Sequence, residues 1–208
     1  MDSRRKRIEQ AQQHTEELIN ESVTLENAKE WVTHGCDFEF RRLDLIGDVD
    51  DNMTAFVRRS IIKLVDISPT LPIEIHLSTY GGELNEALSI YDMLKACPCP
   101  IYMIANGKIM SAGLPIFLAG THRLSYANTR FMMHSISHKT GGKLKDTEID
   151  VKEGRFLNNV MIDILSKHTK KDKKWWESKI GSHDFYFSQK EAMAIGVLTP
   201  MPKAKKGK

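Results

Sequence analysis

The chain has 208 residues, with 30 Lys plus Arg against 27 Asp plus Glu and a formal charge of +3. Its hydrophobic share of 41% and charged share of 27% are those of a globular domain, which excludes a disordered, collagen-like or disulfide-scaffold protein. No apolar run approaches the roughly 18 to 20 residues that cross a bilayer, so we expect a soluble protein that does not enter a membrane.

The first part of the chain predicts a polar helical arm. Residues 1–7 are basic, but a mostly polar stretch follows them, unlike the apolar segment of a secretion signal. Over residues 4–31 the apolar positions are too sparse to form a strong helical stripe. We therefore expect residues 1–35 to form an arm and residues 36–200 to form the folded domain.

Three strand-helix units open this domain. Short apolar runs predict strands, and each is followed by a segment with helical periodicity. The predicted strands are residues 43–47, 73–77 and 101–105, and the predicted helices are residues 53–65, 84–94 and 111–119. The strands start at intervals of about thirty residues, which is the length of a parallel strand-helix-strand unit. The pattern predicts an α/β fold with a mostly parallel sheet.

The rest of the domain mixes short strands with a long helix. Residues 123–126 and 130–134 predict two strands, joined by a hairpin or a tight corner. Apolar residues recur at helical spacing over about residues 145–169 and predict an unusually long helix. The last predicted elements are a helix over 172–180, a strand over 184–187, a capping box from Ser188 to Glu191, and a helix stop at Gly196.

The charge and the cysteines bear on partners and location. The tail, residues 201–208, holds four lysines, so the chain without it carries a charge of −1. A nearly neutral body argues against nucleic-acid binding, and we expect the tail to be disordered. The three cysteines are an odd number without the spacing of a zinc knuckle or a disulfide framework. Reduced thiols in the cytoplasm are the expected state.

Two strand-to-helix junctions carry residues that could do chemistry. Gly81 and Gly82 follow the second predicted strand, where glycines let backbone amides approach a ligand, although such a pair often only forms a turn. Ser111 occupies the same topological position in the next unit, where a serine acts as a nucleophile or as a helix cap. The carboxyl ends of parallel strands share one edge, so we expect these residues to lie together.

A base is needed beside the serine. His134 ends an apolar strand after Ser111, with His138 as a local rival. His183 adjoins Asp184, but no second ligand pair at helical spacing accompanies them, so we expect no metal site. The candidates run in the order serine, histidine, acid, which differs from the order of the α/β-hydrolases.

These residues resemble the proteolytic subunit of the Clp protease, a family with the crotonase-like superfold. The resemblance extends over residues 41–198 and includes six segments in the order of the family. They are residues 42–51, 76–82, 110–113, 130–134, 145–169 and 184–197. It implies repeated strand-helix units with a mostly parallel sheet, and makes residues 145–169 a protruding handle helix.

The resemblance also implies the roles of single residues. It makes Ser111 the nucleophile, His134 the general base and then acid, and Asp184 the carboxylate that orients the imidazole. Gly81 and Ala112 would donate the oxyanion-hole amides. The remaining positions implied to hold an extended polypeptide substrate are Gly82, Glu83, Leu84, Ser135, Ile136 and Ser137.

The family assembles as two stacked heptameric rings joined by the handle helices, without a cofactor of its own; ATP, if used, binds to a separate AAA+ unfoldase. Tyr80 stands where the family has Pro, and Lys108 to Met110 replace its small residues. These departures, and the charged arm, resemble a phage- or plasmid-type member that acts without the unfoldase. Two alternatives remain at this point: an inactive scaffold of the same fold, and a crotonase-fold acyl-CoA hydratase or hydrolase.

Overall fold

The structure is a computed structural model that describes residues 13, 24–26, 29, 31–137, 144–181 and 183–200. The predicted arm therefore lies largely outside the described residues, and the tail over 201–208 lies wholly outside them. Residues 31–34 are helical and lead into the first strand. No helix in the described part of the chain is long and apolar enough to cross a membrane.

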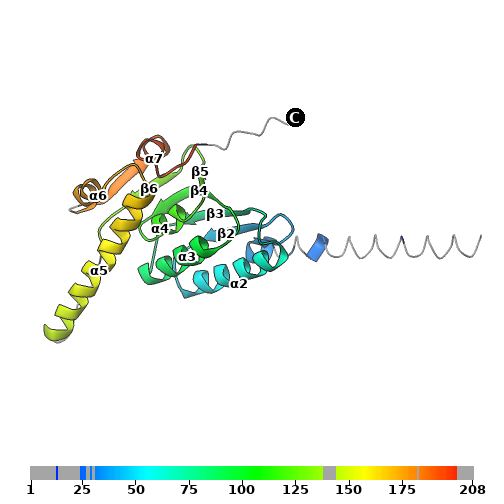
Figure 1. Cartoon of the computed structure of the whole chain (residues 1–208), viewed down its shortest axis with the longest axis horizontal. Coiled ribbons are helices and arrows are strands. Elements are labelled where there is room, and N and C mark those ends of the chain that lie inside the picture. Colours follow the sequence, from blue (N-terminus) through cyan, green and yellow to red (C-terminus); the bar gives the residue numbers. More distant parts are fainter. Residues whose placement is uncertain are drawn as a thin grey trace, which may run out of the picture.

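A seven-stranded sheet forms the centre of the molecule (Figure 1). Its order is β1-β2-β3-β4-β6-β7, and β5 pairs with β4 beside this path. β2, β3 and β4 pair in parallel, as do β4 with β5 and with β6, whereas β1 and β7 join antiparallel. The strands are β1 (Cys36–Asp37), β2 (Arg42–Ile46), β3 (Ile73–Thr79), β4 (Ile101–Met110), β5 (His122–Ser125), β6 (Arg130–Met133) and β7 (Phe185–Ser188). The predicted parallel α/β architecture is confirmed.

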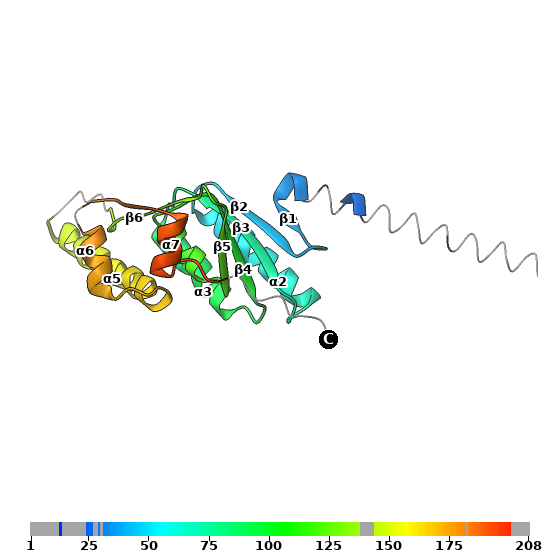
Figure 2. The same ribbon diagram turned by 90° about the horizontal axis from the view of Figure 1, so that it is seen from above.

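The helices that connect the parallel strands pack together against the sheet (Figure 2). They are α2 (Asp51–Ile67), α3 (Leu84–Ala96) and α4 (Gly113–Leu118). Asp50 caps α2 by accepting a hydrogen bond from the Met53 amide, which fixes where the helix begins. Alternate residues of β3 are buried, and α4 is buried along its whole length. The sheet edge that carries Gly81 and Ser111 is thus backed by a packed core.

β5 and β6 form a tight corner, so the hairpin alternative is wrong. Both strands run parallel to β4, β5 along its first half and β6 along its last three residues. The corner between them is attached to the middle of β4, because Tyr126 N and Thr129 Oγ1 each donate to the Ala105 carbonyl at 3.1 Å. β4 is consequently longer than the predicted strand 101–105 and extends to the residue before Ser111.

The long helix α5 (Leu144–His168) projects from the body as a handle (Figure 1). Its carboxyl-terminal half packs in the core through Met161, Ile164 and Leu165. Its amino-terminal half exposes Ile149 and Phe156, at 62% and 61% of their surfaces. The prediction of a protruding helix is confirmed, and its apolar residues divide between a buried half and an exposed half.

The carboxyl-terminal elements enclose the base of this helix. α6 (Lys173–Ile180) buries Trp176 completely, and the indole donates to Thr169 Oγ1 at 3.0 Å. α7 (Gln189–Ile195) starts at the predicted capping box, in which Ser188 and Glu191 each bond to the backbone amide of the other. Gly196 ends α7 in the left-handed conformation, with φ of 86°, as predicted.

A buried arginine joins these elements to the sheet. The Arg123 side chain, in a residue only 8% exposed, donates to the carbonyl oxygens of Gly120, His168, Gly196 and Val197 at 2.7 to 3.2 Å. Burial lowers the pKa of its guanidinium. The end of α5, the turn after α7 and the start of β5 are therefore held by one side chain.

Candidate active site

Ser111 lies in a sharp turn between β4 and α4. Its amide donates to the Met132 carbonyl at 2.9 Å, which joins the turn to β6. Its φ is +51°, a left-handed conformation that costs a residue other than glycine about 1 to 2 kcal/mol. Strain of this kind persists only where the surroundings enforce it, and here it holds the serine on the wall of a pocket.

The two glycines before α3 lie directly against this serine. Gly81 and Gly82 have φ values of +107° and +151°, which only glycine adopts readily. A Cβ added at Gly81 would come within 2.8 Å of the Ser111 Cβ, and one added at Gly82 would meet the Val49 carbonyl oxygen at 2.3 Å. The Val49 backbone fixes the turn, because it bonds to Gly81 O at 2.9 Å and to Glu83 N at 2.8 Å. Glycine is therefore required at both positions, for its backbone conformation and because a Cβ would clash with neighbouring atoms.

The hydrogen bonds of this turn correct one prediction. The Gly81 amide was expected to donate into an oxyanion hole, but it donates to Thr79 Oγ1 at 2.9 Å instead. Thr79 is completely buried, so this bond holds the Gly81 amide inside the protein. Gly82 and Ala112 line the pocket, whereas Gly81 does not. Thr79 satisfies the first amide, and the second glycine is the one that borders the pocket.

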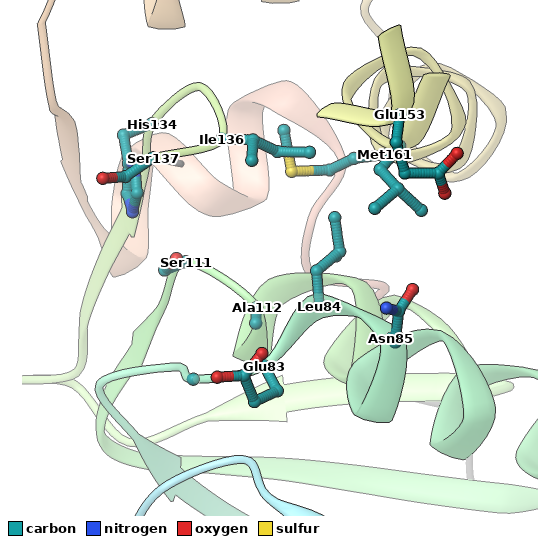
Figure 3. A pocket seen from close by; sticks show the side chains of 12 residues that line it. Glu83, Leu84, Asn85, Ser111, Ala112, His134, Ile136, Ser137, Glu153 and Met161 are labelled. Atoms are coloured by element: carbon teal, nitrogen blue, oxygen red, sulfur yellow. The ribbon is translucent and has the colours of Figure 1, made fainter. Parts of the chain in front are cut away.

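His134 follows the last residue of β6 and lies half-buried on the same pocket. Figure 3 shows its ring extending toward Ser111. Nδ1 is 2.5 Å from the Ser135 carbonyl oxygen. A carbonyl oxygen only accepts, so in the neutral ring this contact places the proton on Nδ1 and leaves Nε2 as the acceptor. That tautomer is the one a base beside a serine requires.

The backbone of Asp184 lies next to that of His134. β6 and β7 pair antiparallel with Met133 opposite Phe185, so the following register position faces His134 with Asp184. The Asp184 side chain is exposed, and among the described residues it forms no hydrogen bond with the imidazole. The register brings the pair together, but the side chains are not engaged.

The candidate residues surround a pocket of about 340 Å³. Eight of its lining residues were predicted from the sequence, namely Gly82, Glu83, Leu84, Ser111, Ala112, His134, Ile136 and Ser137. Ser135 instead lines a neighbouring pocket of about 490 Å³. Four lining residues were missed, namely Asn85, Glu153, Leu157 and Met161. Three of these, Glu153, Leu157 and Met161, recur every four residues along α5, and the apolar spacing that includes Leu157 and Met161 predicted the helix but not its contact with the pocket.

Metal-ligating side chains and cysteines are the other groups in the described residues that could carry chemistry. Across the described part of the chain, no group of three or more His, Cys, Asp and Glu side chains is arranged to hold a metal ion. Cys36, Cys97 and Cys99 are all free thiols. Burial, the largest cause, and the neighbouring Cys99 thiol raise the pKa of Cys97.

With this geometry established, comparisons with known proteins identify the family. The family model described as Clp protease matches residues 27–201. The chain belongs to the Clp protease family. Its curated relatives include the ATP-dependent Clp protease proteolytic subunit of Deinococcus radiodurans, 28% identical over 72% of this chain and 74% of the relative. The corresponding subunit of Cyanophora paradoxa is 27% identical over 72% of this chain and 78% of the relative.

The solved structures agree with this assignment at the level of the fold. A ClpP1 mutant from Listeria monocytogenes superposes with a TM-score of 0.71, over 77% of this chain and 90% of that one, at 24% identity. Among the curated sequence relatives, the ATP-dependent Clp protease proteolytic subunit 2 of Treponema denticola is also 24% identical, over 80% of this chain and 84% of the relative. The Clp protease chain described here therefore has the ClpP fold, as its sequence predicted.

Proposed function

We propose that this chain is a serine endopeptidase in which Ser111 attacks the peptide bond and His134 serves as its base. The observation that carries the proposal is the shared pocket of the two residues, with Ser111 in a strained left-handed turn and His134 Nδ1 held by a carbonyl oxygen. Membership of a family whose members are named proteolytic subunits supports peptide-bond hydrolysis.

The pocket residues divide the reaction into two steps. The Ser111 hydroxyl adds to the substrate carbonyl carbon while His134 Nε2 takes its proton. The amides of Gly82 and Ala112 donate to the oxyanion that forms. The intermediate collapses to an acyl-serine as the imidazolium returns the proton to the leaving amine. A water molecule, deprotonated by His134, then hydrolyses the ester and regenerates Ser111.

Asp184 is our candidate for the carboxylate that stabilises the imidazolium. The register of β6 and β7 places it opposite His134, and its exposed side chain is free to turn toward Nδ1. The Ser135 carbonyl oxygen, already 2.5 Å from Nδ1, is the competing partner. Asp184→Asn is therefore expected to lower kcat by more than tenfold, and a smaller loss would assign the orienting role to the carbonyl.

Two extended segments next to the pocket are suited to holding a polypeptide. Residues 82–83 lead into Leu84, the first residue of α3, and residues 135–137 follow His134 beyond the end of β6 without helical structure. Both contribute lining residues to the pocket. A substrate chain lying between them as an added strand would be recognised mainly through its backbone.

We further propose that the subunit works in an oligomeric chamber, as two stacked heptameric rings in the cytoplasm. The exposed apolar residues of the projecting half of α5, Ile149 and Phe156, are suited to a contact between copies. A separate AAA+ unfoldase would supply any ATP-driven step. Native mass spectrometry tests the assembly, with fourteen subunits as the expected result and a monomer as the contrary one.

Active-site labelling tests the chemistry directly. A fluorophosphonate is expected to modify Ser111, and Ser111→Ala is expected to remove labelling and to lower peptide cleavage by about 10⁴-fold or more. Ser178→Ala, at an exposed serine outside the pocket, serves as the matched control. Labelling that persists in the Ser111→Ala protein would refute the assignment. Peptide binding without turnover would favour an inactive scaffold, and turnover of a CoA thioester would favour the crotonase chemistry.

A further inference from the structure

Beyond the nucleophile, the pocket continues into the space between α3 and α5 (Figure 3). Leu84, at the start of α3, forms one wall, and Leu157 and Met161 from α5 form the opposite wall. Ile136 lies on the side nearest to His134. A side chain that enters from the scissile bond therefore first passes between apolar groups.

A carboxylate stands at the far end of this apolar passage. Glu153 is four residues before Leu157 on α5, so both project from the same face of the helix. Figure 3 shows it across the pocket from Asn85, with Leu84 and Met161 nearer to Ser111. Glu153 is exposed, so the far end of the passage opens to water.

The described residues that line the pocket carry a net negative charge. Glu83 supplies a second carboxylate, and no lysine or arginine is present among the described residues that line the pocket. Within the described part of the chain, neither Glu83 nor Glu153 forms a salt bridge. Glu83 precedes α3 but does not cap it with its side chain. Both carboxylates therefore remain available to a cation on a substrate.

Basic, acidic and apolar side chains of a substrate would fit this pocket to different degrees. A lysine or arginine combines an apolar stem with a terminal cation, which matches apolar walls that end in a solvated carboxylate. An acidic side chain would meet two like charges. A purely apolar side chain would use the walls and gain nothing from Glu153.

We propose that the chain prefers polypeptides with lysine or arginine immediately before the scissile bond, and that Glu153 sets this preference. The inference rests on the proposed peptidase function and names its substrate class. Glu153 acts on the substrate cation and takes no part in the proton transfers at Ser111. Its effect should consequently appear as a ratio between substrates.

The test uses the full-length protein and two fluorogenic peptides that differ only at the residue before the scissile bond, lysine in one and norleucine in the other. Norleucine has the stem of lysine without the ammonium group. We expect kcat/KM to favour the lysine peptide by about two- to fivefold at low salt and less at high salt. A ratio of one or below at low salt would overturn the proposal.

Two substitutions on the same helix assign the effect. Glu153→Gln is expected to bring the lysine-to-norleucine ratio close to one, and an unchanged ratio would overturn the role of Glu153. Glu148→Gln makes the same change at an exposed position outside the pocket and should leave the ratio unaltered.

Fluorophosphonate labelling of Ser111 distinguishes the proposed specificity from the proposed peptidase function. Labelling and norleucine cleavage without a lysine preference would reject the specificity alone. If the unsubstituted protein showed neither labelling nor peptide cleavage, the proposed peptidase function would be rejected and the proposed specificity with it.

Discussion

Protonation of His168 is expected to destabilise the protein in mild acid. The ring, at the end of α5, lies 2.7 Å from the Tyr91 hydroxyl through Nε2. Burial, followed by the positive charges of Lys95, Arg123 and Lys167, lowers the pKa of His168 from 6.5 to about 4. The folded protein therefore keeps the ring neutral over a pH range in which the unfolded chain binds a proton.

The sign and the size of the effect follow from these two pKa values. The stability that neutral His168 contributes is complete above pH 6.5 and is lost as the pH falls toward 4. The full difference corresponds to about 3 kcal/mol. Water reaches part of the ring, which reduces the expected loss to about 1 to 2 kcal/mol.

Urea unfolding of the wild type and of His168→Gln, at several pH values between 7 and 4, measures this contribution. Glutamine keeps a polar partner for Tyr91 and does not titrate, so the difference between the proteins isolates the imidazole. We expect the stability advantage of the wild type over the variant to shrink by about 1 to 2 kcal/mol between pH 7 and pH 4. An advantage that is constant with pH would show that His168 is not held neutral by its surroundings.

Two further predictions concern the turn beside the nucleophile and the buried arginine. Gly82→Ala would place a Cβ 2.3 Å from the Val49 carbonyl oxygen, so we expect fluorophosphonate labelling to slow by about 100-fold or more, and normal labelling would contradict the proposed role of this turn. Arg123→Met leaves four carbonyl oxygens without their donor and should cost about 3 kcal/mol, seen as a fall in Tm of about 6 to 12 °C. The exposed Arg130→Met is the control, and an equal fall in both variants would refute the argument.

Sequence patterns located most elements because apolar runs and helical spacing correspond to burial. The strand predicted from the sequence is shorter than β4, because Asn106, Gly107 and Lys108 interrupt the apolar run although the backbone continues as a strand and pairs with β6. They also left the corner between β5 and β6 undecided. A turn sequence shows that the chain bends, but both of the strands it joins pair with β4, a long-range choice that the turn does not encode.

The candidate site shows a similar division. The order of the motifs predicted that Ser111 and His134 lie close together, and both line the same pocket because each follows the end of a strand at one edge of the sheet. The choice between the neighbouring glycines depended on one hydrogen bond from Gly81 to the Thr79 side chain, which has no signature in the sequence. Glu153 was missed because a charged residue on a long helix normally belongs to its solvated face, and only the tertiary position of α5, which packs against α4 and α6, brings this residue to the pocket.

The corner between β5 and β6 has a consequence for the spacing of the reacting groups. Along β4 the partner of Ala105 is Ser125, twenty residues later, whereas the partner of Met110 is Met132, twenty-two residues later. The corner thus accommodates two additional residues before β6 begins. Removing them would keep the alternation of side chains but slide β6 along β4 by about 7 Å, and the residue after it would no longer lie beside the serine. In a lineage of such proteins, insertions and deletions at this corner would thus be expected only with compensating changes, because its length adjusts the distance between nucleophile and base.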